Sequence, residues 1–289
     1  MATEHVPRAG DAAAEPTLRR VKDLQSFTIG ATDGDIGTVD DVYFEDESWT
    51  VRYLVVDASG WLVSRHVLIP PRAIQQIDPT GQRLVTNLTK QQVEGSPVLE
   101  SERPVSRQYE TDLYGYYGYP HYWAGPYRWG VAAYPYAAAG YPLGAVGASR
   151  RPAEVEEQAA RRRASEDPHL RSARDVSGHA IEATDGELGH VEDYLVDDQA
   201  WVIRYLIVDP RNWWPGAHVL VSTEWITAVH WNDSTVEVNV SKEAVRNAPV
   251  YDPTAWVSRD YESRYHGHHG RPGYWDRQPE SWMLYPPAA

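Results

Sequence analysis

The chain has 289 residues, no cysteine and a formal net charge of −14. A chain without cysteine cannot form disulfides, thiolate zinc sites, iron–sulfur clusters or a cysteine nucleophile. The acidity lies in two blocks, because residues 23–98 hold 11 acidic and 5 basic side chains and residues 175–250 hold 13 and 4; such blocks repel phosphate backbones, so no nucleic-acid partner is expected.

The N-terminal residues 1–19 are expected to be disordered, and they contain no apolar core of signal-peptide length. The least polar window, residues 131–148, is interrupted by prolines and falls short of the apolar run that a membrane-spanning helix needs. The sequence therefore predicts a soluble, cytoplasmic protein without membrane insertion.

Beyond the N-terminal residues, the sequence contains a repeat at a fixed offset. The segment ATDGDIGTVDD, residues 31–41, returns 152 residues later as ATDGELGHVED, residues 183–193. The same offset relates WTVRYLVVD (49–57) to WVIRYLIVD (201–209), and no gap is needed. Self-similarity at a constant offset over about 75 residues indicates two copies of one domain.

Each copy, residues 20–100 and residues 170–252, is expected to be an all-β domain. VRYLVVD and its counterpart IRYLIVD are rich in β-branched and aromatic residues, as strands are. Short strands separated by turn signals favour a small antiparallel barrel. Thr89 and Ser241 are expected to cap a short helix after the last strand of each copy.

Two segments differ from the copies in composition. Residues 101–169 form a low-complexity linker rich in Tyr, Gly, Pro and Trp, with a short helix expected near residues 153–165. Residues 253–289 form a tail rich in Tyr, Trp, His and Pro. Both segments have few aliphatic residues with which to build a core, so we expect disorder in the tail and in the linker outside its helix.

The repeated motif is interpreted as a hairpin. The dipeptides Asp33-Gly34 and Asp185-Gly186 are the favoured central pair of a type I′ turn, in which both residues take positive φ. Gly37 and Gly189 suit a bulge or a close approach of two backbones. The acids fail the spacing of a calcium-binding EF-hand loop, which leaves a weak divalent-metal site as the less favoured alternative.

Two pairs of adjacent acids lie in the same motif, Asp40 with Asp41 and Glu192 with Asp193. Adjacent residues of a strand point to opposite faces, so the members of a pair do not converge on one substrate for acid–base catalysis. We therefore expect these acids on solvated faces.

Arg52 and Arg204 lie inside otherwise apolar strands. A half-buried arginine is usually paired with a carboxylate, so a structural ion pair is favoured over a ligand-binding role. The candidate partners are Asp41 or Glu45 for the first arginine and Asp193 or Asp197 for the second.

The segment RNWWPGAHV, residues 211–219, contains two adjacent tryptophans. Trp213 and Trp214 cannot easily both face one small core, and exposed tryptophan is typical of interaction hot spots. The first copy has Trp61 and Leu62 at the same positions. Our hypothesis is that these tryptophans, Trp214 foremost, form a contact with a protein partner or with the other copy.

Near the C-terminal end, YHGHHG places His266, His268 and His269 close together. A short histidine cluster binds zinc or nickel weakly, so these are the weak metal-ligand candidates. The sequence contains no nucleophile elbow, phosphate-binding loop, dinucleotide fingerprint or zinc-protease motif. No cofactor and no enzymatic activity are expected.

The segments IGATDGDIGTVDDVYFEDESWTVRYLVVD and IEATDGELGHVEDYLVDDQAWVIRYLIVD resemble the PRC-barrel family in three features: the Asp-Gly turn, the acidic stretch after it and the R-Y-L-[VI]-V-D strand. That family includes the cytoplasmic domain of the photosynthetic reaction centre H subunit and the C-terminal domain of the ribosome maturation factor.

The resemblance implies two PRC-barrel-like domains in tandem. It also implies a non-enzymatic adaptor or assembly module, which binds another protein or a second copy of itself. A role in photosynthesis and electron transport like that of the reaction centre H subunit is the alternative. A divalent-metal-binding protein or an enzyme is less favoured.

Overall fold

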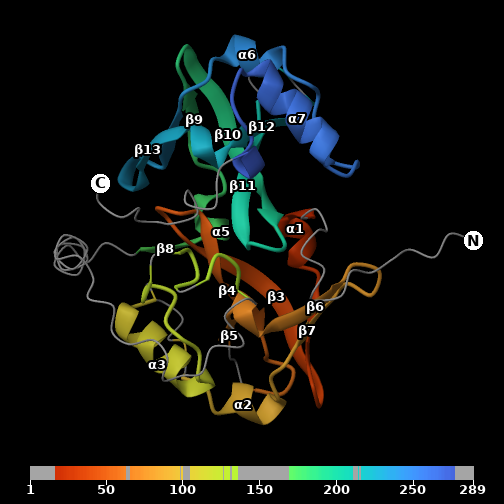
Figure 1. Ribbon diagram of the computed structural model, residues 1–289, viewed down its shortest axis with the longest axis vertical. Helices are drawn as coiled ribbons and strands as arrows, with labels where there is room; N and C mark the ends of the chain where they lie inside the picture. The colour runs from red at the N-terminus through yellow and green to blue at the C-terminus, as the bar shows by residue number, and fades with distance from the viewer. Residues whose placement is uncertain are drawn as a thin grey trace, which may run out of the picture.

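A computed structural model describes residues 17–62, 66–97, 99, 105–125, 127–130, 132–135, 169–210, 214 and 216–276. Two lobes lie one above the other, the first copy below and the second above (Figure 1). The N-terminal residues 1–16 and the helix expected near residues 153–165 lie outside the described residues. Within the described part, no helix has the length and apolar character needed to cross a membrane.

The first repeat is a series of short strands that ends in two helices. Its elements are β1 (Leu18–Arg20), α1 (Val21–Leu24), β2 (Thr28–Ala31), β3 (Gly34–Glu45), β4 (Thr50–Asp57), β5 (His66–Ile69), the 3₁₀ turn Pro71–Ala73, β6 (Ile74–Asp78), β7 (Arg83–Thr86), α2 (Lys90–Glu94) and α3 (Arg107–Tyr117).

The second repeat has the same elements in the same order, with two further 3₁₀ turns, η4 (Trp231–Asp233) and η5 (Tyr274–Asp276). They are β8 (Leu170–Ser172), α5 (Ala173–Val176), β9 (Ala180–Ala183), β10 (Gly186–Asp197), β11 (Val202–Asp209), β12 (Val219–Ser222), the 3₁₀ turn Thr223–Trp225, β13 (Ile226–His230), β14 (Thr235–Val238), α6 (Lys242–Arg246) and α7 (Arg259–His268). Except for β5 and β12, each pair of elements begins 152 residues apart. Thr89 and Ser241 cap α2 and α6, as expected.

The strands form one continuous sheet instead of two closed antiparallel barrels. Its order is β13-β14-β9-β10-β11-β4-β3-β2-β7-β6. Most pairs are antiparallel, but β2 pairs with β7 and β9 with β14 in parallel. The chain passes from β5 into β6 through one 3₁₀ turn without a hairpin, and this gives β7 the direction of β2. The expectation of antiparallel pairing is therefore wrong for these two pairs.

The two repeats exchange their first strands. Strand β1 of the first repeat pairs with β10 of the second, with Leu18 opposite Asp197. Strand β8 of the second repeat pairs with β3 of the first, with Leu170 opposite Glu45. The helices that follow go with their strands, because α1 packs on β10 and α5 packs on β3. Each repeat is therefore completed by a segment of the other.

A direct backbone link lies at the centre of this exchange. Thr50 of β4 is opposite Val202 of β11. The amide of Val51 donates to the carbonyl of Trp201, and the amide of Ile203 donates to that of Trp49, both at 2.8 Å. The two bonds are related by the 152-residue offset, so the repeats meet around a local twofold relation.

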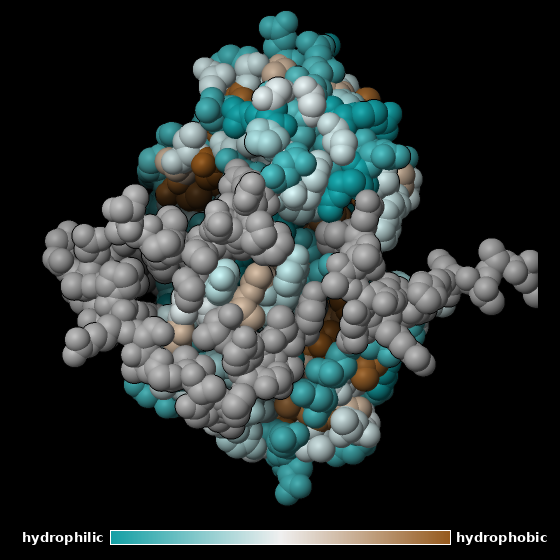
Figure 2. Space-filling view, in the orientation of Figure 1, coloured by the Kyte–Doolittle hydropathy of each residue, from teal (hydrophilic) through white to brown (hydrophobic). Residues whose placement is uncertain are grey.

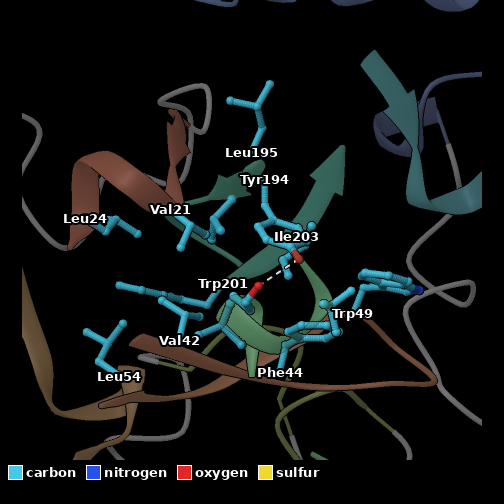
Figure 3. Close-up of a cluster of buried hydrophobic side chains, with 14 of the residues drawn as sticks. Val21, Leu24, Val42, Phe44, Trp49, Leu54, Tyr194, Leu195, Trp201 and Ile203 are labelled. Atoms are coloured by element: carbon cyan, nitrogen blue, oxygen red, sulfur yellow. Dashed lines mark hydrogen bonds between the residues drawn. The ribbon is translucent and has the colours of Figure 1, made fainter. Parts of the chain in front are cut away.

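Apolar side chains from both repeats fill the space around this link, as Figure 3 shows. The ring of Phe44 stacks on Trp49 at 5.0 Å and lies 6.2 Å from Tyr194 of the second repeat. The buried apolar residues of the two repeats belong to one cluster. A shared core of this kind makes the two repeats one packing unit.

Both segments that were expected to be disordered contain packed helices. Helix α3 buries Leu113 and Tyr114, and α7 buries Tyr265 and His266. Aromatic rings supply the apolar area that aliphatic residues supply elsewhere, so the shortage of aliphatic residues misled the prediction. The repeats also extend beyond the boundaries predicted at residues 100 and 252.

The exchange predicts that a change in one repeat loosens the other. Leu18→Ala removes a buried side chain of β1, which is expected to cost about 2 kcal/mol or more. Because β1 pairs with β10, hydrogen exchange should quicken at the amides of Leu195–Asp197. The matched variant Leu170→Ala should quicken exchange at the end of β3 instead. Faster exchange confined to the mutated repeat would contradict the exchange of strands.

Candidate functional site

The repeated Asp-Gly motif forms a hairpin whose register differs by one residue from the predicted one. Ala31 pairs with Gly34, so the two loop residues are Thr32 and Asp33. A type I′ turn needs positive φ at both loop residues, but the positive φ of 143° falls on Gly34, after the loop. The second copy is the same, with Gly186 at 117°. Glycine is therefore needed where the chain leaves the turn.

The aspartates of these turns bind the start of a nearby helix. The Oδ1 of Asp33 accepts from the amide of Lys90, the first residue of α2, at 2.8 Å. The Oδ1 of Asp185 accepts from the amide of Lys242, the first residue of α6, at 2.7 Å. Each carboxylate thus satisfies a backbone donor that a helix leaves unpaired. This contact explains the carboxylate without a metal ion.

Gly37 and Gly189 lie where two backbones touch. A Cβ atom on Gly37 would overlap the carbonyl oxygen of Asp57, and one on Gly189 would overlap that of Asp209. Gly189 also has a φ of 146°. Both hairpins are irregular in register beside these glycines. The bulge and the close approach expected from the sequence are both present.

Gly37→Ala is predicted to destabilise the protein by about 2–3 kcal/mol or more, because the new methyl group must push apart two paired strands. Gly60→Ala is the matched control, since nothing lies within 4 Å of its added Cβ, and it should change stability by less than about 0.5 kcal/mol. Urea unfolding of both variants makes the comparison. Equal losses would show that the contact with Asp57 is not the cause.

The acidic pairs bind the exchanged segments. The Oδ1 of Asp41 accepts from the amide of Arg174 in α5, and the Oδ1 of Asp193 accepts from that of Lys22 in α1, both at 3.2 Å. Asp41 and Asp193 are buried, so the expectation of a solvated face is wrong for both. The physical reason is that each acid is covered by the first segment of the other repeat.

The neighbouring acid of each pair adds an ion pair to the same segment. Asp40 binds the side chain of Arg174 at 2.8 Å, and Glu192 binds that of Lys22 at 3.2 Å. These ion pairs are partly exposed, so each contributes about 1 kcal/mol or less. All four acids therefore hold the two repeats together.

Asp193 provides a pH-dependent prediction. Burial raises the pKa of Asp193 to about 6, and its Oδ2 has no hydrogen-bond partner. Between pH 4 and pH 6 the folded protein retains a proton that the unfolded chain has lost, so stability should fall as the pH rises through this window.

Asp193→Asn keeps an acceptor oxygen and removes the charge. It is expected to stabilise the protein at pH 7.5 by up to about 3 kcal/mol. It should reduce the pH dependence between 4 and 6 without removing it, because burial also raises the pKa of Asp198 to about 6. Asp41→Asn is the matched control, with a smaller expected gain because the hydroxyl of Ser172 donates to Asp41. Urea unfolding across this pH range tests both variants, and a loss of stability in Asp193→Asn at pH 7.5 would contradict the prediction.

Arg52 is fully buried and paired. Its guanidinium donates to Glu45 at 2.6 Å and to the carbonyl of Arg128 at 2.5 Å, and it lies 3.8 Å from the centre of the Tyr122 ring. Burial acts to raise the pKa of Glu45, but the charge of Arg52 and the hydrogen bonds from Ser48 and Arg52 together outweigh it and hold this pKa at about 2. Glu45 was one of the two partners named from the sequence.

Arg204 repeats this arrangement in the second copy. Its guanidinium donates to the Oδ2 of Asp197 at 2.7 and 3.1 Å and lies 3.9 Å from the centre of the Tyr274 ring. Asp197 was also one of the two named partners. Both arginines are therefore held between a carboxylate and a tyrosine by groups of the chain itself.

A second buried charge cluster was missed by the sequence analysis. Glu110 of α3 binds Arg107 at 3.0 Å, the hydroxyl groups of Tyr53 and Tyr122 at 3.0 and 2.7 Å, and His169 at 2.6 Å. In an apolar interior a carboxylate with this many partners holds its neighbours in fixed positions.

The second repeat has a counterpart of this cluster. Glu262 of α7 binds Arg259 at 2.8 Å and the hydroxyl of Tyr205 at 2.9 Å. The signal was the same 152-residue offset, which continues from SRQYE (106–110) to SRDYE (258–262). The sequence analysis did not use this signal, because the composition of the surrounding residues is typical of a disordered segment.

The three histidines of α7 and its end contact different groups. His266 is buried and binds the Tyr205 hydroxyl at 2.9 Å, whereas His268 binds the carbonyl of Ala244 at 2.9 Å. His269 packs on Trp225, and burial lowers its pKa to about 4. Among the described residues, no group of three His, Asp or Glu side chains is arranged to hold a metal ion.

The tryptophans named from the sequence differ in their surroundings. Trp61 donates from Nε1 to the carbonyl of Ile36 at 2.6 Å and lies under the ammonium of Lys90. Leu62 is buried. Trp213 lies outside the described residues. Trp214 is half-buried and packs against the core, so it is not the freely exposed ring that was one expectation.

Trp214 lines a groove in the second repeat. The other lining residues include Pro249, Val250, Tyr251 and Tyr265. Three of them belong to the connection between α6 and α7, residues 247–258, which we call the α6–α7 connection. Val250 and Trp256 of this connection are 72 and 62 % exposed. On the face drawn in Figure 2, hydrophilic residues predominate and apolar ones form small patches.

Comparison with known proteins defines the first repeat. Residues 16–93 match the PRC-barrel domain, so the chain contains one PRC-barrel domain there. Over 79 residues the chain is 33 % identical to an uncharacterised protein of Deinococcus radiodurans. This match covers 27 % of the present chain and 28 % of that relative, so the chain spans little more than a quarter of the relative's length.

Proposed function

We propose that this protein is a non-enzymatic interaction module built from two PRC-barrel repeats, in which the second repeat presents an apolar contact surface to a protein partner. The assignment of the second repeat rests on the constant offset and on the shared strand pairings, including a parallel pair in each repeat. The proposal assigns no reaction and no cofactor to the chain.

The observation that carries the proposal is the exposure of Val250 and Trp256 on the α6–α7 connection. Large apolar side chains are costly to leave in water, and tryptophan is the residue most enriched in binding hot spots. The aligned positions of the first repeat hold Val98 and Pro104. The exposed tryptophan is therefore a feature of the second copy alone.

The charge of the molecule restricts the class of partner. The net charge is −14, and Asp252 lies inside the α6–α7 connection. A partner with an apolar side chain flanked by lysine or arginine would complement both the exposed apolar residues and the negative electrostatic potential of the molecule. The exchanged strands hold the two repeats together, so this surface would be presented without a large ordering cost on binding.

Peptide selection against the full chain tests this proposal. A displayed random-peptide library should yield peptides that combine an aromatic or aliphatic anchor with basic residues. Binding of these peptides should weaken at least about tenfold in the double variant Val250→Ser, Trp256→Ser, because truncation of a hot-spot residue costs about 2 kcal/mol or more.

Tyr116→Ser provides the matched control, since Tyr116 is an exposed aromatic residue of the first repeat, and it should leave the affinity unchanged. Sedimentation velocity on the same variants separates a partner from self-association. Peptides that bind the double variant and the unmodified chain equally would contradict the proposed surface.

A further inference from the structure

Arg72 is a buried cation without a carboxylate partner. It lies in the 3₁₀ turn between β5 and β6 and is only 3 % exposed. One nitrogen donates to the carbonyl of Trp129 at 3.1 Å. The other two guanidinium nitrogens, Nε and NH1, have no hydrogen-bond partner, and no acid of the described residues forms an ion pair with Arg72. Leaving a buried guanidinium unpaired is costly.

Two acids of the first repeat are already paired with other side chains. Glu45 pairs with Arg52, and Glu110 pairs with Arg107 and His169. Arg72 therefore lies outside the ion pairs formed by these two acids.

The groups beside Arg72 are phenols and another arginine. Burial lowers the pKa of Arg72, the phenols of Tyr114 and Tyr119 oppose this change, and the charge of Arg52 adds to it. The hydroxyl of Tyr114 is buried and also has no hydrogen-bond partner. Unused donors of two side chains therefore lie in the same region of the core.

The second repeat has no arginine at the position that corresponds to Arg72. The residue 152 positions after Arg72 is Glu224. Burial lowers the pKa of Arg128 to about 10, and the carboxylate of Glu224 acts against this change. At one structural position, the second repeat thus supplies an anion and the first repeat supplies a cation.

We propose that the first repeat binds a small inorganic anion at Arg72, which accepts from the free N–H groups of its guanidinium. Ionised acceptors form the strongest hydrogen bonds with guanidinium groups. The surrounding rings are buried, so a large organic acid would have to displace the core. The ligand class is therefore a halide or an ion of similar size, and chloride is the probe.

Thermal unfolding of the full chain tests the site. Chloride is titrated against gluconate at constant ionic strength, so that general screening stays fixed. A ligand that binds only the folded state stabilises it in a saturable way, and the melting temperature should rise by about 2 °C or more. Arg72→Met should lose this rise, whereas Arg264→Met, which changes an exposed arginine, should keep it.

Arg72→Glu places in the first repeat the residue that Glu224 provides in the second. This variant distinguishes a loss of anion binding from a loss of stability. It should abolish the effect of chloride and leave the melting temperature in gluconate at or above that of the unmodified chain. Crystals soaked in bromide should show an anomalous peak within hydrogen-bond distance of Arg72. Equal melting temperatures of the unmodified chain in chloride and gluconate, or a chloride effect that persists in Arg72→Met, would overturn the proposal.

Discussion

The exchange of the first strands is the constraint on which the rest of this structure depends. Strand β1 pairs with the second repeat and strand β8 pairs with the first. At the centre, Thr50 of one repeat pairs with Val202 of the other. This arrangement takes the acids of the repeated motif out of water and gives Asp41 and Asp193 backbone donors from the opposite repeat. Without the exchange, two buried carboxylates would lose the donors that make their burial tolerable.

Buried charge is distributed in the same way within each repeat. An arginine inside an apolar strand lies between a carboxylate and a tyrosine ring, as Arg52 does with Glu45 and Tyr122. The tyrosine comes from the aromatic segment that follows the strands, so this segment is part of the domain and covers its polar interior. The aromatic segment satisfies one further donor of this pair, because the carbonyl of Arg128 accepts from Arg52; the Nε of Arg52 has no hydrogen-bond partner.

The two copies differ where a function is most readily placed. Their strands, turns and central hydrogen bonds match, which is what a shared scaffold requires. The differences lie in the exposed Trp256, which aligns with Pro104, and in the buried Arg72, which aligns with Glu224. A duplicated domain can change one copy while the other maintains packing, so a difference at an aligned position is more informative about function than the residues that both copies share.

The sequence by itself determined the repeat, the main strands, the close approach at Gly37 and Gly189 and the narrow choice of partners for Arg52 and Arg204. These features depend on residues that are near in the chain or related by a constant offset. Only the tertiary structure decided that the repeats exchange strands, that α3 and α7 are packed, that Asp41 and Asp193 are buried and that Arg72 has no acidic partner among the described residues. The physical reason is that burial of a side chain depends on which distant segment covers it, and local patterns do not contain that information.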